Sequence, residues 1–143
     1  MGFSVSGSAA IVFVGIFLAF STAYTASANG FERVTDAKSA VDEEALDRQN
    51  TALSVTNATY DAGNATLTVE AVNEGTTALD VDAVDLIVDN AYRDDYAVRR
   101  VGGDNATRLW LPGERLHLEV TVTSQPDRIK LVTGPGVAAT EVL

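Results

Sequence analysis

Cysteine is absent from the 143 residues of this chain, and histidine occurs once. The lack of cysteine excludes disulfides, thiol catalysis, cysteine-ligated zinc and iron–sulfur clusters. The single histidine, His117, lies at a polar position of an alternating strand pattern, which predicts an exposed side chain. Neither a G-x-S-x-G nucleophile motif nor a glycine-rich phosphate loop occurs. We therefore predict that the protein is not an enzyme and has no catalytic residue, cofactor or metal ligand.

Basic residues are also scarce. The chain carries 20 Asp and Glu against 10 Lys and Arg, a formal net charge of −10, and only Lys38 and Lys130 are lysines. This charge repels phosphate backbones, so we expect no nucleic-acid partner. Acid excess with little lysine is typical of a halophilic protein, because molar salt shortens the Debye length to about 3 Å and screens the self-repulsion. The aspartates match no fixed-spacing calcium loop and predict a solvated face.

Charge is missing altogether from residues 1–31, and the first charged side chain is Glu32. Within this segment Ala9 to Phe20 is continuously apolar. A bilayer core of about 30 Å requires about 20 such residues in a helix, and residues 5–28 are long enough. We predict a membrane-anchor helix in residues 1–31. Its anchor side chains are Ile11, Val12, Phe13, Val14, Ile16, Phe17, Leu18 and Phe20.

Two other interpretations of the apolar segment stay open. Ala26-Ser27-Ala28 resembles the cleavage site of a secretory signal, although no Lys or Arg precedes the apolar run as such signals require. A pilin-type signal places charged residues before the helix, where this chain has only Met1-Gly2-Phe3-Ser4. Our main prediction is therefore an uncleaved, single-pass anchor.

Residues 32–50 change to a charged helical pattern. Apolar residues recur at spacings of three or four, at Val34, Ala37, Val41 and Ala45, and charges fill the other faces. We predict a solvated spacer helix that continues the anchor and holds a domain away from the membrane. Packing on a partner helix is the alternative, because small residues in the anchor allow close approach.

Three Asn-x-Thr sequons lie in the acidic C-terminal part, at Asn57, Asn64 and Asn105. This motif is an acceptor for N-glycosylation on translocated, exposed segments, and Asn and Thr are also ordinary turn and strand residues. We expect glycosylation of at least one site and an extracellular C-terminal domain.

Residues 51–143 follow a period of two, which indicates half-buried strands. The alternation is clearest at Leu67, Val69 and Ala71 and again over residues 116–122, and turn signals separate such runs. About seven strands without intervening helices predict an antiparallel, immunoglobulin-like β-sandwich. The alternation shifts phase between residues 79 and 88, which predicts a bulge or a strand that changes sheets near Ala83.

Aromatic residues beside arginines are the candidate contact site. Tyr92 and Tyr96 flank a short predicted loop, and arginines lie within and after it, a composition enriched at protein interfaces. The predicted partner-contact residues are Tyr92, Arg93, Tyr96, Arg99 and Arg100. Trp110, the only tryptophan, has two interpretations, a core residue between the sheets or a partner contact. Sheet edges offer pairing surfaces for a second copy.

Several segments resemble haloarchaeal archaellum accessory proteins of the FlaF/FlaG type, FlaF more than FlaG. They are Met1-Gly2-Phe3-Ser4-Val5-Ser6-Gly7-Ser8, Phe31-Glu32-Arg33-Val34-Thr35-Asp36-Ala37, Gln49-Asn50-Thr51-Ala52 and Val55-Thr56-Asn57-Ala58-Thr59-Tyr60. The resemblance implies a cell-membrane anchor and an immunoglobulin-like domain beneath the S-layer, which contacts S-layer protein as part of the stator of the archaellum motor. It supplies no catalytic residue.

These observations together predict three parts: an anchor in 1–31, a spacer in 32–50 and a sandwich in 51–143. We predict an archaellum stator component that supports motility. Its partners would be the membrane, S-layer protein and other archaellum subunits such as a FlaG-like protein, in a homodimer or hetero-oligomer. The alternative is a pilin- or archaellin-like filament subunit whose N-terminal helix packs in a polymer core. A third class is an ion- or substrate-binding module.

Overall fold

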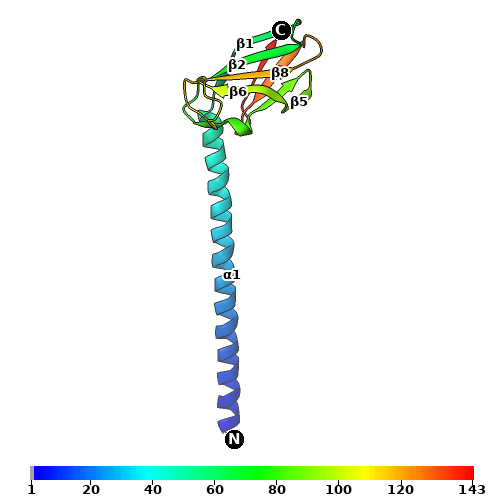
Figure 1. The fold of residues 1–143 in the computed structure, drawn as a ribbon. Helices are drawn as coiled ribbons and strands as arrows, with labels where there is room; N and C mark the ends of the chain where they lie inside the picture. Colours follow the sequence, from blue (N-terminus) through cyan, green and yellow to red (C-terminus); the bar gives the residue numbers. More distant parts are fainter. Residues whose placement is uncertain (1) are drawn as a thin grey trace. The chain divides into compact units, whose positions relative to one another are not determined.

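The computed structural model describes residues 2–143, and Met1, with which the predicted anchor segment begins, lies outside the described residues. The described chain forms one α-helix, α1 (Gly2–Asn50), followed by ten strands and one 3₁₀ turn (Figure 1). This order confirms the predicted helix followed by antiparallel β-sheets. The chain divides after Glu43 into two compact units, so the last turns of α1 belong to the same unit as the strands.

The helix α1 runs without interruption through both the uncharged and the charged segment. No proline occurs in it to break the ladder of backbone hydrogen bonds. In the uncharged segment, which we call the apolar half of α1, the Ser21 hydroxyl donates to the carbonyl of Phe17 at 2.9 Å. The Thr25 hydroxyl donates to the carbonyl of Ser21 at 3.0 Å. These hydroxyls therefore need no water, which suits a helix in lipid. Within the described residues one helix is long and apolar enough to cross a membrane, and it lies near the N-terminus.

The ten strands pair antiparallel throughout and form three sheets, two of four strands and one of two. The first sheet has the order β1-β2-β8-β6, the second β10-β9-β4-β5 and the third β3-β7. The strands are β1 (Leu53–Asp61), β2 (Thr66–Asn73), β3 (Leu79–Asp80), β4 (Asp85–Val88), β5 (Ala91–Arg93), β6 (Tyr96–Val101), β7 (Leu109–Trp110), β8 (Arg115–Thr121), β9 (Arg128–Val132) and β10 (Ala138–Val142). The expected number was about seven. It was too low because β3, β5 and β7 are too short to show an alternating pattern.

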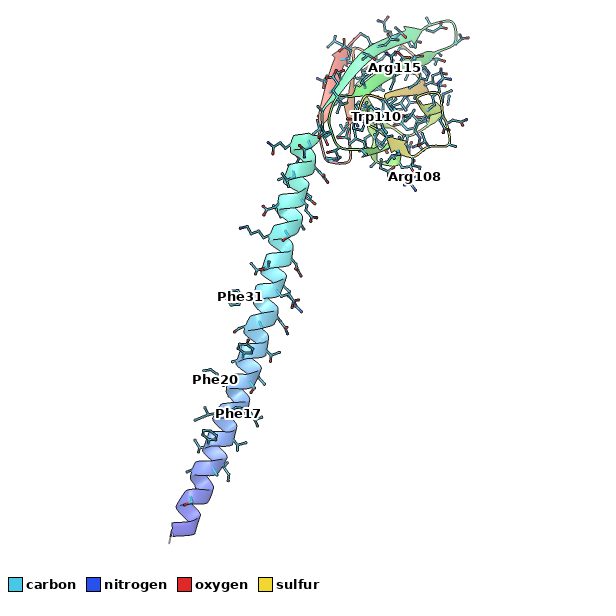
Figure 2. All side chains as sticks on the ribbon, turned by 90° about the vertical axis from the view of Figure 1, so that its left-hand side faces the viewer. Phe17, Phe20, Phe31, Arg108, Trp110 and Arg115 are labelled. Carbon is cyan, nitrogen blue, oxygen red and sulfur yellow. The ribbon has the colours of Figure 1, made fainter. Side chains whose placement is uncertain are left out.

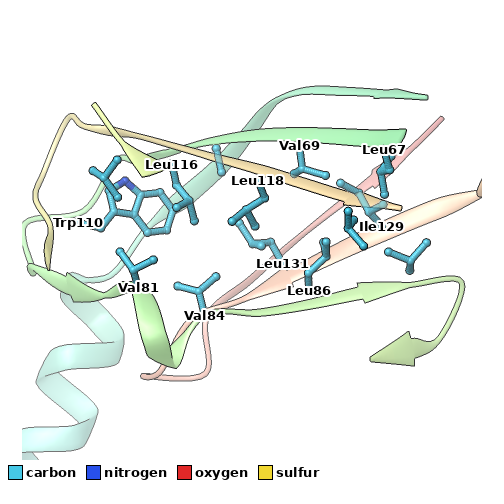
Figure 3. Close-up of a cluster of buried hydrophobic side chains, with 14 of the residues drawn as sticks. Leu67, Val69, Val81, Val84, Leu86, Trp110, Leu116, Leu118, Ile129 and Leu131 are labelled. Carbon is cyan, nitrogen blue, oxygen red and sulfur yellow. The ribbon is translucent and has the colours of Figure 1, made fainter. Parts of the chain in front are cut away.

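The hydrophobic core lies between the first and second sheets (Figure 3). Strand β2 buries Leu67, Val69 and Ala71, as the alternation predicts, and β8 buries every second residue in the same way. From the second sheet β4 and β9 contribute Leu86 and Ile129, both without solvent exposure. A face-to-face sandwich therefore holds the domain together through burial of apolar surface.

The phase shift near Ala83 is a change of sheet, which is one of the two predicted alternatives, and not a bulge. Strand β3 pairs with β7 in the third sheet, whereas β4 pairs with β9 in the second. Between them lies a 3₁₀ turn, Val81–Ala83, whose N-cap Asp80 accepts a hydrogen bond from the Asp82 amide at 2.9 Å. The turn accounts for the one-residue shift in the alternation of buried and exposed positions. As a result, Val81 and Val84 both point into the core.

The end of α1 is hydrogen-bonded to the loop after β2. The backbone amide of Thr76 donates to the carbonyl of Asn50, the last helical residue, at 2.8 Å. The backbone amide of Gly75 donates to the carbonyl of Ala52, just after the helix, at 3.0 Å. On the other side the Arg48 side chain donates to the carbonyl of Pro135 at 3.0 Å. The last helical turn is therefore fixed to the folded unit that contains the strands.

Substitution Gly75→Ala should disrupt this connection. A Cβ atom at Gly75 would lie 2.5 Å from the carbonyl oxygen of Asn50 and 2.6 Å from the amide nitrogen of Ala52, both backbone atoms. The loop or the helix end must shift, and we expect a loss of about 1–3 kcal/mol in the free energy of unfolding. Urea denaturation of a fragment comprising residues 44–143 measures it. Gly63→Ala is the control, because its Cβ meets only the flexible Asp61 carboxylate at 3.2 Å; equal losses in both variants would contradict the prediction.

Candidate partner-binding surface

The predicted contact residues lie on two edge strands. Strand β5 is the edge of the second sheet and β6 is the edge of the first, with Asp94 and Asp95 between them. Tyr92 on β5 is 59% exposed. Tyr96 on β6 is half-buried and packs against the core, and this burial raises its pKa to about 12. Of the two tyrosines, Tyr92 is the one that a partner can reach.

The arginine of this segment is held within the domain. Arg93 donates two hydrogen bonds to the Asp95 carboxylate, at 2.7 and 2.8 Å, and a third to the carbonyl of Thr121 at 2.6 Å. The hydrogen bond from Arg93 holds the pKa of Asp95 below its ordinary value. With its guanidinium so engaged, Arg93 connects β5 to the end of β8 and has few donors left for a partner.

Arg99 and Arg100 are neighbours on β6, so their side chains leave on opposite faces. Arg99 pairs with Asp82 in the turn before β4, and Arg108 forms an ion pair with the same carboxylate, with 2.5 Å between the nitrogen and the oxygen. Arg100 instead lies beside the imidazole of His117, with 3.3 Å between the nitrogens. The five predicted contact residues therefore do not form one continuous surface.

A continuous surface does form around Tyr92 on the outer face of the second sheet. Register pairs Tyr92 with Ile87, Ile87 with Lys130 and Lys130 with Thr140, which places one row of side chains across all four strands. Arg128 and Val142 form a neighbouring pair on the same face. We call the residues Tyr92, Ile87, Lys130, Thr140, Arg128 and Val142 the Tyr92 face.

The Tyr92 face combines apolar and basic side chains. Val142 is 74% exposed, and a groove on the surface is lined in part by Ile87, Arg128 and Lys130. Partial desolvation of the hydroxyl and the nearby carboxylates of Asp85 and Asp94 raise the pKa of Tyr92 above its ordinary value. An exposed tyrosine with apolar and cationic neighbours is what protein interfaces favour.

The outer face of the first sheet carries a charged cluster around His117. Cross-strand register places His117 between Glu70 and Arg100. Its ring nitrogens lie 3.2 Å from Glu70 and 2.9 Å from Glu119, so each nitrogen is within hydrogen-bond distance of a carboxylate. The expected exposure of His117 is wrong: its side chain is 14% exposed because longer side chains on the neighbouring strands enclose it.

Substitution Glu70→Gln should flatten the acid dependence of stability. The hydrogen bond to His117, and then the charge of Arg115 at 3.0 Å, lower the pKa of Glu70 below its ordinary value. A carboxyl group whose pKa is lower in the folded state stabilises the fold above about pH 4.5 and loses this contribution as the pH falls further. Glu70→Gln should therefore be less stable at pH 7 and lose less stability between pH 5 and pH 3.

Denaturation of the 44–143 fragment with urea at a series of pH values tests this expectation. Glu141→Gln removes an exposed carboxylate from β10 and serves as the control. If the free energy of unfolding changed equally with pH in Glu70→Gln and in the unchanged fragment, protonation of the cluster would not be linked to folding.

The three sequon asparagines are exposed. Asn57 lies on β1 opposite Glu70, Asn64 lies in the β1–β2 turn, and Asn105 lies in the loop after β6. The amide of Asn64 donates to the Asp61 carboxylate at 2.7 Å. Glycosylation of these exposed positions stays a prediction.

Trp110 lies inside the core, without solvent exposure (Figure 3). Its indole nitrogen donates to the carbonyl of Glu114 at 2.8 Å. Of the two interpretations of Trp110, the structure therefore favours the core residue. Asn73 begins an Asn-Glu-Gly segment typical of an exposed turn, and yet it is a fully buried polar residue that sequence reasoning does not identify.

The eight anchor side chains are all exposed along α1. Among residues 2–143 no group of three or more His, Asp or Glu side chains is arranged to hold a metal ion.

Comparison with known proteins gives one family match over nearly the whole chain. The model of the archaeal-type flagellin family matches residues 2–141. No curated protein matches the sequence.

Two solved structures resemble this chain at low sequence identity. The archaellum periplasmic stator protein FlaG from Sulfolobus acidocaldarius is 16% identical, with a TM-score of 0.47 over 65% of this chain and 99% of that one. A chain of the archaellum periplasmic stator protein complex FlaF and FlaG from the same organism is 17% identical, with a TM-score of 0.43 over 64% of this chain and 87% of that one.

Proposed function

This chain belongs to the archaeal-type flagellin family, and we propose that within it the protein is a non-enzymatic, membrane-anchored stator component of the archaellum. The observation that carries the proposal is the division of α1 into two halves. Residues 2–31 have no charge, whereas charged residues recur in every turn from Glu32 to Arg48. A stator must be held in the membrane and must also reach a fixed structure outside it, and such a helix serves both needs.

The charged half of α1 argues against a filament subunit. In a polymer core each helix is surrounded by other helices, and burying unpaired charges costs several kcal/mol per ion. The side chains of residues 32–43 are exposed and suit water. A helix of this kind is better suited to a spacer between a bilayer and an external domain. At about 1.5 Å per residue the spacer adds roughly 25–30 Å.

We propose that the sandwich lies outside the cell. Three exposed sequons in the strands and loops support this orientation, because N-glycosylation acts on translocated segments. The uncharged half of α1 would then cross the cell membrane once, with the sandwich beneath the S-layer. We further propose a halophilic source and a FlaF-like rather than FlaG-like role, on the acidic composition and the N-terminal sequence.

The proposed partners are S-layer protein and another archaellum subunit such as a FlaG-like protein. The Tyr92 face supports such contact, since it offers exposed tyrosine and valine beside two basic side chains in a strongly acidic chain. Arg93, Tyr96, Arg99 and Arg100 would act mainly by holding β5 and β6 in place.

Fractionation of source cells separates the stator from the filament interpretation. We expect a tagged full-length chain in the membrane fraction and not in sheared, purified archaella. A deletion strain should still assemble archaella but should not swim. Recovery of the chain as a stoichiometric component of purified filaments would instead establish a filament subunit.

Co-sedimentation of the 44–143 fragment with native S-layer sheets at molar salt tests the external partner. Tyr92→Ala combined with Lys130→Ala should abolish co-sedimentation, because both side chains lie on the Tyr92 face. Thr68→Ala, on the other sheet, is the control and should bind normally. If the folded, unchanged fragment stays in the supernatant, the S-layer assignment is wrong and the partner is within the archaellum.

A further inference from the structure

Most basic side chains of the sandwich form ion pairs with carboxylates of the same chain. The arginines that do so are Arg93, Arg99, Arg108 and Arg115. Figure 2 labels two of them, Arg108 and Arg115, on the sandwich. By contrast, Arg128 and Lys130 on β9 form no ion pair with any of residues 2–143. Two positive charges on one strand are therefore left without an opposite charge, in a chain whose net charge is −10.

The groups around these two cations do not neutralise them. The Arg128 guanidinium donates to the side-chain carbonyl of Asn90 at 2.6 Å, and this neutral group holds it in place. The Asp89 carboxylate instead accepts from the backbone amides of Asp127 and Arg128, at 3.0 and 3.1 Å. Lys130 is exposed and lines the same surface groove as Arg128 and Asp89. An anionic group outside the chain can therefore reach both charges.

The three sequons lie away from this surface. Asn57 is on β1, Asn64 is in the β1–β2 turn, and Asn105 is in the loop after β6. Strands β1, β2 and β6 all belong to the first sheet, and no sequon lies on a strand of the second. Glycans at the predicted positions would therefore leave the Tyr92 face, which is on the second sheet, uncovered.

Apolar side chains beside the two cations favour contact with a protein. Tyr92 and Val142 are largely exposed, and Ile87 lines the groove with the cations. Asp85 lies beside the Tyr92 hydroxyl and forms no ion pair with either cation. At molar salt the Debye length is about 3 Å, so only charges in direct contact attract each other appreciably, and partly buried pairs are screened least. Apolar contact around Arg128 and Lys130 would provide such shielding.

We propose that the Tyr92 face binds an extended acidic segment of a partner protein, whose carboxylates pair with Arg128 and Lys130. These two residues occupy alternate positions of β9, about 6.5–7 Å apart along the strand. An extended segment repeats the side chains of one face at the same spacing. Acidic residues at alternate positions of the partner can therefore meet both cations at once. Tyr92, Ile87 and Val142 would pack against its apolar atoms.

A second copy of this chain fits the surface less well than an acidic segment. In a two-fold contact each copy presents the same patch, so the partner brings the same two unpaired cations. Like charges placed together at an interface oppose binding, whereas carboxylates neutralise Arg128 and Lys130.

The inference rests on the proposed function for the existence of an external partner and adds the chemistry of that partner. Its probe is a short fluorescent peptide in which aspartate alternates with threonine. Fluorescence anisotropy measures its Kd for the full-length chain in non-ionic detergent at molar salt. One control peptide has asparagine in place of aspartate, and another has the same composition with all aspartates contiguous. We expect binding of the alternating peptide and much weaker binding of both controls.

Substitutions on β9 assign the binding to the two cations. Lys130→Gln and Arg128→Gln should each raise the Kd about tenfold, because each removes a charged hydrogen-bond donor. The matched controls are Lys38→Gln and Arg33→Gln, which remove the other lysine and an arginine from the charged half of α1 and should leave the Kd unchanged. Lys130→Glu should bind a peptide that alternates lysine with threonine, a gain that damage to the fold cannot produce.

Four results would overturn the proposal. They are no binding of the alternating peptide, equal binding of either control peptide, an unchanged Kd in Lys130→Gln, or tighter binding of a polyuronate than of the peptide. The last result would assign the face to an anionic polysaccharide. If the peptide does not bind and Lys130→Gln instead weakens self-association of the chain, the occupant is a second copy.

The two proposals fail in different ways. If the chain is found in filaments, the stator role fails whatever the peptide does. If the chain is found in membranes but the alternating peptide is not bound through Arg128 and Lys130, the stator role stands and the proposed partner chemistry is wrong.

Discussion

Asn73→Asp should lower the free energy of unfolding of the 44–143 fragment by about 3 kcal/mol or more at pH 7. Asn73 has no solvent exposure and is the last residue of β2. Its amide nitrogen donates to the carbonyls of Thr77 and Trp110 at 2.9 and 3.1 Å, and its amide oxygen accepts from Gly75 at 3.0 Å. An aspartate would turn two donors into a charged oxygen that faces two carbonyl oxygens.

The effect of Asn73→Asp should depend on pH in a direction that identifies its cause. Desolvation and the facing carbonyls favour the protonated carboxyl, which can donate one hydrogen bond, so its pKa should rise above the ordinary value. The deficit in stability should therefore shrink as the pH is lowered from 7 to 4, opposite to the usual loss from paired carboxylates. Urea denaturation at both values measures it.

Asn73→Ala and Asn57→Ala complete the test. Alanine at 73 removes the partner of the Gly75 amide and of the carbonyls of Thr77 and Trp110. We expect the free energy of unfolding to fall by about 3 kcal/mol or more, by an amount that does not change with pH. Asn57 is an exposed asparagine on a neighbouring strand, where the same change should cost less than about 0.5 kcal/mol. Similar losses at 57 and 73 would mean that the buried hydrogen bonds add nothing.

The elements of this fold that follow a regular pattern of buried and exposed residues were predictable from sequence. The alternation of Leu116, Leu118 and Val120 is local information, because each buried side chain is set by its own place in the pleat. The change of sheet near Ala83 was predictable for the same reason, since a one-residue slip must exchange the two faces. The helix followed from composition and from the absence of proline.

The candidate surface was predictable only in part, because it depends on which strands are neighbours. Tyr92 and Tyr96 are close in sequence, but they lie on strands of different sheets. Lys130 and Thr140 are distant in sequence, yet register places them in one row with Tyr92. Cross-strand pairing is information that a single sequence does not carry.

The buried Asn73 was missed for a related reason. In sequence, Asn73-Glu74-Gly75 has the composition of an ordinary exposed turn. Its burial follows from the segment of β7 that approaches it, since the carbonyl of Trp110 accepts from its amide. A polar residue becomes a core residue here because three loops meet at one end of the sandwich.

Trp110→Ala should lower the free energy of unfolding by about 3–5 kcal/mol, because it empties the largest buried position of the core. Trp110 lies at one end of the hydrophobic cluster, near Leu116 and Val81 (Figure 3). Domains of this size have total stabilities of about 5–15 kcal/mol, so the loss is a large share of the whole. Urea denaturation of the 44–143 fragment, followed by circular dichroism, measures it, since the only tryptophan is removed.

Two variants separate the packing of Trp110 from its hydrogen bond and from its place in the chain. Trp110→Phe keeps most of the ring but removes the donor to the carbonyl of Glu114. This carbonyl still accepts from the backbone amide of Asn73 at 3.2 Å, so the loss should be smaller, about 1–2 kcal/mol. Leu109→Ala changes the preceding residue, which is 51% exposed, and should cost about 0.5 kcal/mol or less. If Leu109→Ala cost as much as Trp110→Ala, the apolar contact that holds this end of the sandwich would lie on the outer side of β7 and not in the core.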